Sequence, residues 1–238
     1  MDQLLIALDV ERGAQALALA DTLRGFAGGF KIGSRLFTTE GPGIVRTLTS
    51  RGDRVFLDLK FHDIPNTVAQ SVAAATSLGV WMLNVHAAGG TRMMRSAKDA
   101  ALETAAREGR TPPLVIAVTV LTSMNAQSLQ ESGVHAPVLD QVLRLAELTQ
   151  SAGLDGVVAS PQETALVRQR CGTDFAIVTP GIRGGGATRS DKDDQERTMT
   201  AAEAIAAGAS HIVVGRPIIG AADPTRAAGA IAREAGGS

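Results

Sequence analysis

The sequence has one cysteine, no tyrosine and few other aromatic residues. A lone cysteine, Cys171, can form neither an internal disulfide nor a cysteine-based zinc site, which fits a reducing cytoplasm. The shortage of aromatic rings disfavours stacking on nucleic-acid bases. Positive and negative charges nearly cancel, giving a formal net charge of −1 at pH 7. That balance argues against a nucleic-acid or anionic-membrane surface.

Long hydrophobic runs are also missing. None approaches the roughly 20 residues that a membrane-spanning helix needs. Residues 1–9 contain no basic segment ahead of their apolar stretch, unlike a signal peptide. We therefore expect a cytoplasmic protein with neither a membrane nor a nucleic-acid partner.

What the chain does have is alternation. Short apolar runs rich in β-branched residues alternate with longer Ala- and Leu-rich stretches of helical period. The predicted strands are Leu4–Leu8, Gly29–Ile32, Arg54–Leu59, Trp81–Val85, Leu114–Val120, Gly156–Ala159, Phe175–Val178 and His211–Val214. The predicted helices include Ala14–Leu23, Val68–Leu78, Met93–Arg107, Val138–Ser151, Gln162–Arg170, Thr200–Ala207 and Pro224–Glu234.

Eight apolar strands with helical crossovers predict a parallel sheet that is covered on both faces. No linker or change of composition divides the chain. We predict one α/β domain over residues 1–238, a (β/α)8 TIM barrel, a fold that typically takes about 250 residues. An open doubly wound sheet is the alternative, but no Gly-x-Gly-x-x-Gly turn follows the first strand.

Polar residues lie at the carboxyl ends of seven of the eight predicted strands or just beyond them. They are Asp9, Lys31, Asp58, Lys60, Asp63, Asn84, His86, Thr122, Ser123, Thr179, Arg183 and Arg216. Helix caps or surface loops could explain any one of them. Their concentration at the carboxyl ends of the strands, where barrel active sites lie, instead predicts a functional site.

The third strand carries the densest group of charges. Side chains alternate between the two faces of a strand, so Asp58 and Lys60 should share one face. A surface salt bridge is the simplest interpretation of one Asp-x-Lys pair. Buried charges need partners, however, and Asp63 adds a second carboxylate nearby.

The segment Asp58-x-Lys60-x-x-Asp63-Ile64-Pro65-Asn66-Thr67 strongly resembles the signature of the orotidine 5′-monophosphate decarboxylase family. The stretch Gly184–Asp193, which is Gly-rich and highly charged, departs from the family pattern. The resemblance otherwise extends over the whole chain, through Ala7–Asp9, Phe30–Gly33, Val85–Gly90, Leu121–Ser123, Thr179–Arg183, Asp194–Arg197 and Val214–Ile218.

The resemblance implies decarboxylation of orotidine 5′-monophosphate to uridine 5′-monophosphate, the last step of pyrimidine nucleotide synthesis, without cofactor or metal. It assigns Lys31, Asp58, Lys60 and Asp63 to an array of alternating charge around the ribose and the reacting carbon, with Lys60 as proton donor to C6. It also implies a homodimer in which Asp63 and Thr67 enter the site of the partner subunit.

Further residues are expected to bind the nucleotide. Gly215 allows close backbone approach and Arg216 can grip two phosphate oxygens. The stretch from Arg183 to Gln195, including residues 184–194, is either a surface loop or a lid over the phosphate. The complete substrate-binding set is Asp9, Lys31, Thr67, Thr122, Ser123, Pro180, Arg183, Gln195, Gly215 and Arg216, of which Thr122, Ser123 and Pro180 are expected along the pyrimidine.

Two other functions stay open at this point. Keto-sugar phosphate decarboxylases and hexulose-phosphate synthases share the Asp-x-Lys-x-x-Asp signature, but they use Mg²⁺ and place a carboxylate ligand on strand two. This chain has Lys31 there, and its charge would repel the metal ion. A phosphate-binding sensor would need Arg216 but would have no use for the charged array.

The histidines lack the spacing of a metal site. His62 and His86 are expected to pack or hydrogen-bond near the site. His211 begins the last strand, at the opposite end of the barrel, and is expected to be structural.

Overall fold

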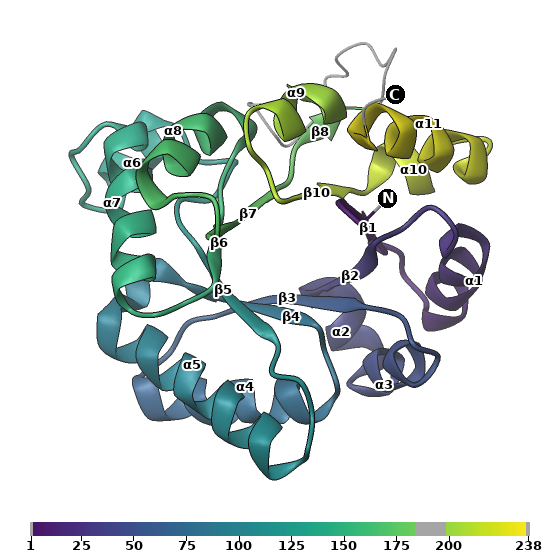
Figure 1. Ribbon diagram of the computed structural model, residues 1–238, viewed down its shortest axis with the longest axis horizontal. Helices are drawn as coiled ribbons and strands as arrows, with labels where there is room; N and C mark the ends of the chain where they lie inside the picture. Colours follow the sequence, from purple (N-terminus) through teal and green to yellow (C-terminus); the bar gives the residue numbers. More distant parts are fainter. Residues whose placement is uncertain (1, 184–198, 237–238) are drawn as a thin grey trace.

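The computed structural model describes residues 2–183 and 199–236 of the chain. Eight parallel strands in these ranges close into a barrel, and helices surround it (Figure 1). The strands are hydrogen-bonded in chain order, and β1 closes the ring against β10. The predicted (β/α)8 barrel is confirmed, and the open sheet is excluded by the closure.

The barrel strands lie within one or two residues of the predicted ranges. They are β1 (Leu4–Ala7), β2 (Gly29–Gly33), β3 (Val55–Phe61), β4 (Met82–His86), β5 (Leu114–Val118), β6 (Gly156–Val158), β7 (Ala176–Thr179) and β10 (His211–Val214). Two short strands, β8 (Ile182–Arg183) and β9 (Met199–Thr200), form a separate parallel pair.

Helices connect successive strands. They are α1 (Gly13–Leu23), α2 (Ser34–Glu40), α3 (Gly43–Ser50), α4 (Pro65–Ser77), α5 (Gly90–Arg107), α6 (Ala126–Glu131), α7 (Val138–Ser151), α8 (Pro161–Cys171), α9 (Ala201–Ala206), α10 (Arg216–Ile219) and α11 (Pro224–Gly236), with a 3₁₀ turn, η1 (Ala87–Gly89). Within the described ranges no helix is long and apolar enough to cross a membrane.

The second connection differs from the sequence prediction, which assigned no helix to residues 34–53. The structure has two short helices there, α2 and α3. They are separated at Gly41, whose φ is +67°, and Pro42, a pair of residues that ends one helix and prevents its continuation. The buried residues of α3, Ile44, Val45 and Leu48, do have helical spacing, so this helix leaves a signal in the sequence.

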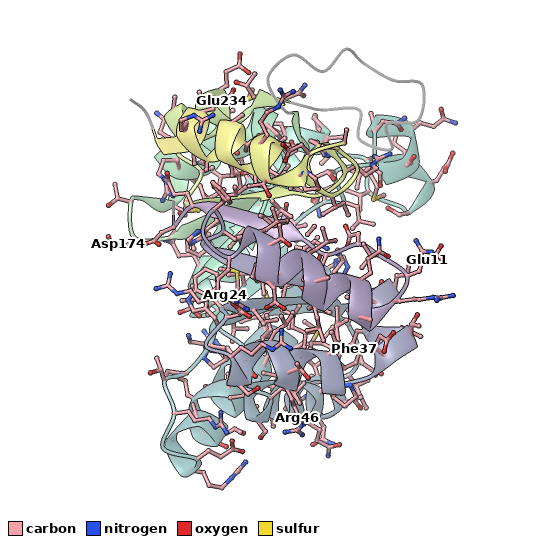
Figure 2. All side chains as sticks on the ribbon, turned by 90° about the vertical axis from the view of Figure 1, so that its right-hand side faces the viewer. Glu11, Arg24, Phe37, Arg46, Asp174 and Glu234 are labelled. Carbon is pink, nitrogen blue, oxygen red and sulfur yellow. The ribbon has the colours of Figure 1, made fainter. Side chains whose placement is uncertain are left out.

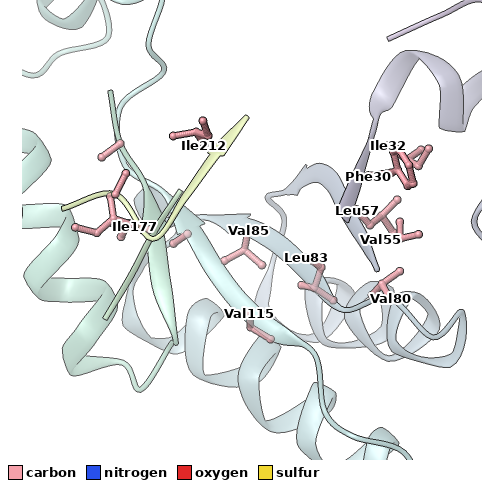
Figure 3. Packing of buried hydrophobic residues seen from close by; sticks show 14 of the residues in the cluster. Phe30, Ile32, Val55, Leu57, Val80, Leu83, Val85, Val115, Ile177 and Ile212 are labelled. Carbon is pink, nitrogen blue, oxygen red and sulfur yellow. The ribbon is translucent and has the colours of Figure 1, made fainter. Parts of the chain in front are cut away.

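The core has two layers, one on each side of the strands. Outward-facing residues such as Phe30, Leu57 and Leu83 pack against the helices (Figure 3). The second layer fills the inside of the barrel, as expected of a barrel of eight strands. It is made by Leu5, Ala7, Phe56, Met82, Ile116, Val178 and Val213.

The inner layer determines which residues can form a site. Side chains alternate along a strand, so residues two positions beyond Ala7, Phe56 and Met82 belong to the same inner face. Those residues are Asp9, Asp58 and Asn84. The apolar interior thus gives way to polar side chains at the carboxyl ends of these strands.

The two ends of the barrel are chemically distinct. Figure 2 shows Glu11, which follows β1, and Asp174, which precedes β7, at opposite sides of the molecule. At the amino end, His211 packs edge-on against Trp81 with ring centroids 5.1 Å apart. Burial lowers the pKa of His211. The prediction that His211 lies away from the candidate site is confirmed.

Gly156 is the first residue of β6, and it lies against the backbone of Ala176 in β7. This contact gives the first testable prediction. A Cβ atom at Gly156 would lie 2.1 Å from the carbonyl oxygen of Ala176. Because β6 must then move away from β7, we expect Gly156→Ala to lower the free energy of unfolding by about 1–3 kcal/mol. Gly43→Ala is the matched control, since a Cβ there meets no neighbour within 4 Å. Urea denaturation measures both; equal midpoints for the two variants would contradict the prediction.

Candidate active site

Four charged side chains from the first three strands form a continuous series of ion pairs. Lys31 Nζ lies 3.0 Å from Asp9 Oδ1 and 3.5 Å from Asp58 Oδ2. Lys60 Nζ lies 2.6 Å from Asp58 Oδ1. The charges alternate in sign along Asp9, Lys31, Asp58 and Lys60, so each inner member has an opposite charge on both sides.

Strand register brings these residues together. Ala7 pairs with Lys31, and Lys31 pairs with Phe56. Lys31 therefore lies in the same row as two residues of the inner layer. Gly33 keeps the space open beside it, because a Cβ at Gly33 would lie 3.1 Å from Lys31 Nζ and 3.3 Å from Asp9 Oδ1.

Asp58 is the most constrained charge of the group. Its side chain is 14% exposed, and burial, the largest single influence, raises its pKa. Lys31, Lys60 and the hydrogen bonds from Lys60 and Asn84 together outweigh burial, so the pKa of Asp58 lies below its ordinary value. Asp58 is therefore ionised at neutral pH, and it holds two ammonium groups beside it.

The end of β3 is irregular. Leu57 pairs with Leu83 and Phe61 with Val85, so four positions of β3 match two positions of β4. Within this bulge Lys60 has a φ of +53°, the only positive φ of a non-glycine residue in the described ranges. Such a conformation costs on the order of 1–3 kcal/mol and is frequent at functional sites. Asp58 and Lys60 do meet as predicted, but through a bulge rather than regular alternation.

Asn84 was among the polar residues predicted at the strand ends, but the sequence assigned it no role in the site. It is completely buried on β4. Its Nδ2 donates to Asp58 Oδ1 at 2.7 Å, and its Oδ1 accepts the backbone N–H of Lys60 at 2.8 Å. The signal available in sequence was a polar residue on the inner face of an otherwise apolar strand.

Asp63 lies apart from these ion pairs. Its side chain is exposed, and its Oδ1 accepts the backbone N–H of Ile64 at 2.6 Å. In the described part of one chain it forms no ion pair, and Asp9 occupies the outer end of the alternating series. Thr67 is half-buried in the first turn of α4. The prediction that both residues serve a partner subunit concerns two chains and stays a prediction.

The remaining predicted residues follow β5, β7 and β10. Thr122 and Ser123 lie between β5 and α6, and Pro180 directly follows β7. Gly215 is next to Asp9, since its Cβ position would lie 3.6 Å from Asp9 Oδ2. Arg216 is exposed and begins the short helix α10.

Part of the predicted binding set cannot be placed in this way. Only the backbone of Arg183, in β8, belongs to the described structure. Gln195 and the predicted lid, residues 184–194, lie outside the described residues.

Two histidines line the same end of the barrel. The rings of His62 and His86 lie with centroids 5.3 Å apart, a contact that the sequence did not predict, although it expected both residues to pack or hydrogen-bond here. Burial, His62 and Lys60 lower the pKa of His86. In the described ranges no group of three or more His, Cys, Asp or Glu side chains could hold a metal ion.

Fold and site together define a class: (β/α)8-barrel enzymes, whose active sites lie at the carboxyl ends of the strands. The chain belongs to the Orotidine 5′-phosphate decarboxylase / HUMPS family, whose model matches residues 2–231.

Individual proteins of known name are similar to this chain over nearly its full length. A protein of Moorella thermoacetica named orotidine 5′-phosphate decarboxylase is 53% identical over 234 residues, covering 98% of this chain and 92% of the relative. One of the same name from Syntrophotalea carbinolica is 53% identical, covering 98% and 94%. The crystal structure of orotidine 5′-phosphate decarboxylase from Lactobacillus acidophilus superimposes with a TM-score of 0.87 at 37% identity, covering 99% of each chain.

The low pKa of Asp58 predicts how its contribution to stability varies with pH. The carboxylate stabilises the fold above roughly pH 4, the ordinary pKa of aspartate, and this contribution is lost as the pH falls through the lower folded-state pKa. Asp58→Asn should therefore lower the free energy of unfolding by about 3–5 kcal/mol at pH 7, with a smaller difference at pH 3. Urea denaturation at both pH values measures it.

Asp174→Asn is the control, because Asp174 is exposed on the far side of the molecule (Figure 2). It should change stability by less than about 0.5 kcal/mol at either pH. A penalty for Asp58→Asn that is constant from pH 7 to pH 3 would contradict the assignment of Asp58 as a compensated buried charge.

Proposed function

We propose that this chain decarboxylates orotidine 5′-monophosphate to uridine 5′-monophosphate, with neither cofactor nor metal, as a cytoplasmic enzyme of pyrimidine synthesis. The alternating series Asp9–Lys31–Asp58–Lys60 carries the proposal. Support comes also from the family and from the relatives named orotidine 5′-phosphate decarboxylase.

The chemistry explains the need for fixed charges. Loss of CO₂ from C6 leaves a carbanion that the pyrimidine ring delocalises poorly, so the protein must stabilise it electrostatically. The Lys60 ammonium stabilises the developing negative charge and then donates its proton to C6 as a general acid. Asp58, 2.6 Å away, holds that ammonium in place through an ion pair.

The position of Lys31 favours this reaction over the magnesium-dependent one. Lys31 is buried on β2, and it is paired with Asp9 and Asp58. A divalent cation at this position would be repelled by the ammonium and would have to compete with it for both carboxylates.

We place phosphate binding at Gly215 and Arg216, which directly follow β10. Gly215 presents backbone without a side chain, and Arg216 carries a guanidinium that suits two phosphate oxygens. Many barrels bind phosphate at this position, where a short helix such as α10 follows the last strand. Thr122, Ser123 and Pro180 are proposed to contact the pyrimidine.

We also propose a homodimer with shared sites. Asp63 and Thr67 lie on the segment that leaves β3 and enters α4, and Ile64 beside them is 66% exposed. An exposed apolar side chain next to a carboxylate that forms no ion pair within residues 2–183 and 199–236 favours contact with a second chain at this segment. In that arrangement Asp63 would complete the charge array around a partner's Lys60.

The primary test is turnover of orotidine 5′-monophosphate in the presence of EDTA. Uridine 5′-monophosphate should form at an undiminished rate. Lys60→Ala should reduce kcat by at least the 10²–10⁴-fold that is typical of a general acid, as measured by loss of substrate absorbance. Circular dichroism checks folding. A folded Lys60→Ala enzyme with near-normal turnover would rule out Lys60 as the proton donor.

Arg216→Ala tests the phosphate contact. It should lower kcat/KM for the nucleotide by a factor corresponding to about 1.5–3 kcal/mol, the scale of a charge-assisted hydrogen bond. The phosphate-free nucleoside orotidine is the control substrate, and its kcat/KM should not change. An equal loss with nucleoside and nucleotide would make Arg216 structural.

Mixing two inactive variants tests the shared site. Lys60→Ala and Asp63→Ala homodimers should each be nearly inactive. A heterodimer would keep one intact site, formed by Lys60 of the second variant and Asp63 of the first. Activity should therefore return when the variants exchange subunits. If mass spectrometry shows exchange and activity stays at the level of the parents, Asp63 acts within its own chain.

A further inference from the structure

We propose that Asn84 is a positioning residue, which fixes the Asp58 carboxylate and the backbone of Lys60 for proton transfer. The proposal rests on the proposed decarboxylation. It goes beyond the hydrogen bond that this uncharged side chain donates to the Asp58 carboxylate.

The bulge in β3 creates the need for such a residue. Leu83 and Val85 pair with Leu57 and Phe61. Asn84 therefore lies opposite the three residues, 58–60, that the bulge leaves without partners in the β3–β4 ladder. Its carboxamide supplies one of the missing hydrogen bonds by accepting the N–H of Lys60 at 2.8 Å.

The carboxamide of Asn84 also contacts the carboxylate of Asp58. Its Nδ2 donates to Asp58 Oδ1 at 2.7 Å, the oxygen that also receives Lys60 Nζ at 2.6 Å. One buried group thus touches the carboxylate and the backbone of the ammonium-bearing residue. A shift of Asn84 would move both members of the Asp58–Lys60 pair.

Backbone strain makes this contact important for geometry. Lys60 has a φ of +53°, and a strained residue keeps its conformation only when its surroundings enforce it. Without the hydrogen bond that its N–H donates to Asn84 Oδ1, Lys60 can relax toward negative φ, which redirects its side chain. A misplacement of roughly 1 Å can cost on the order of 10²-fold in rate.

A carboxamide fits both contacts at any pH. Asparagine offers an acceptor and a donor on one short side chain. Leucine has nearly the same shape, but it would leave the N–H of Lys60 without its partner. Aspartate would keep the acceptor and place a second carboxylate against Asp58.

Two substitutions separate positioning from simple packing. Asn84→Leu should lower kcat on the order of 10²-fold or more, with a much smaller change of KM, because the phosphate and pyrimidine contacts are untouched. Asn84→Asp should be similarly impaired at pH 8, where the introduced carboxylate faces that of Asp58.

The pH profile of Asn84→Asp is the decisive measurement. Two carboxyl groups at hydrogen-bond distance share one proton, which raises the pKa of the pair's second ionisation. Once protonated, the introduced carboxyl can donate to Asp58 and accept from the Lys60 N–H, as asparagine does. The ratio of variant to wild-type kcat should therefore rise at least tenfold as the pH falls from 8 to 5. A purely structural role for Asn84 gives a ratio independent of pH.

Thr149→Val is the control for loss of a buried hydrogen bond. Thr149 is completely buried on α7, and its hydroxyl donates to the carbonyl of Leu145 at 2.7 Å, away from the charged residues. Its kcat should equal that of the wild type, while thermal denaturation reports any loss of stability in all variants.

The outcomes distinguish the two proposals. Wild-type protein that forms no uridine 5′-monophosphate would refute the proposed function itself. Active wild type with normal kcat in Asn84→Leu, or a pH-independent ratio for Asn84→Asp, would overturn the role of Asn84 alone. Failure of both variants to fold would make Asn84 a structural residue and would also overturn it.

Discussion

The candidate site depends on one constraint, the compensation of a buried carboxylate. Asp58 lies at the carboxyl end of β3 with little access to water, and burial alone would favour its neutral form. Lys31 and Lys60 reverse that preference from two sides. Removing either ammonium would leave a poorly compensated charge in the barrel, and such a charge is far more costly than the pair is stabilising. The constraint explains why Lys31 lies on the inner face of β2 and why Gly33 lacks a side chain beside it.

The same arrangement suits electrostatic catalysis. The charges are held in place by strand register before any substrate arrives, so they need little reorganisation during the reaction. The barrel supplies this rigidity through its two apolar layers, which fix the strands on both faces. Strain is confined to one residue of the group, Lys60, and the neighbouring strand supplies a fully buried carboxamide there.

The end of β3 connects the buried ion pairs of the site with an exposed segment that leads into α4. On its inner side lie the ion pairs, and beyond it the chain continues through Asp63 and Ile64 into α4. Asp63 forms no ion pair in the described part of one chain, whereas Asp9 does. The alternating series visible in a single subunit is thus Asp9–Lys31–Asp58–Lys60, and the contribution of Asp63 to a second subunit stays a proposal.

The sequence by itself determined the eight strands, the barrel and the ends of the strands at which polar residues gather. The strands are apolar throughout because both faces of the sheet are buried, and this pattern can be recognised in the sequence. The motif around Asp58 and Lys60 was specific enough to indicate the family. Tertiary structure alone decided which charges touch. The pairing of Lys31 with Asp9 depends on the register between β1 and β2, and the role of Asn84 depends on a bulge in β3. Helices α2 and α3 were not among the predicted helices, although the buried residues of α3 have helical spacing. The exact register and the bulge depend on contacts between strands that are distant in sequence.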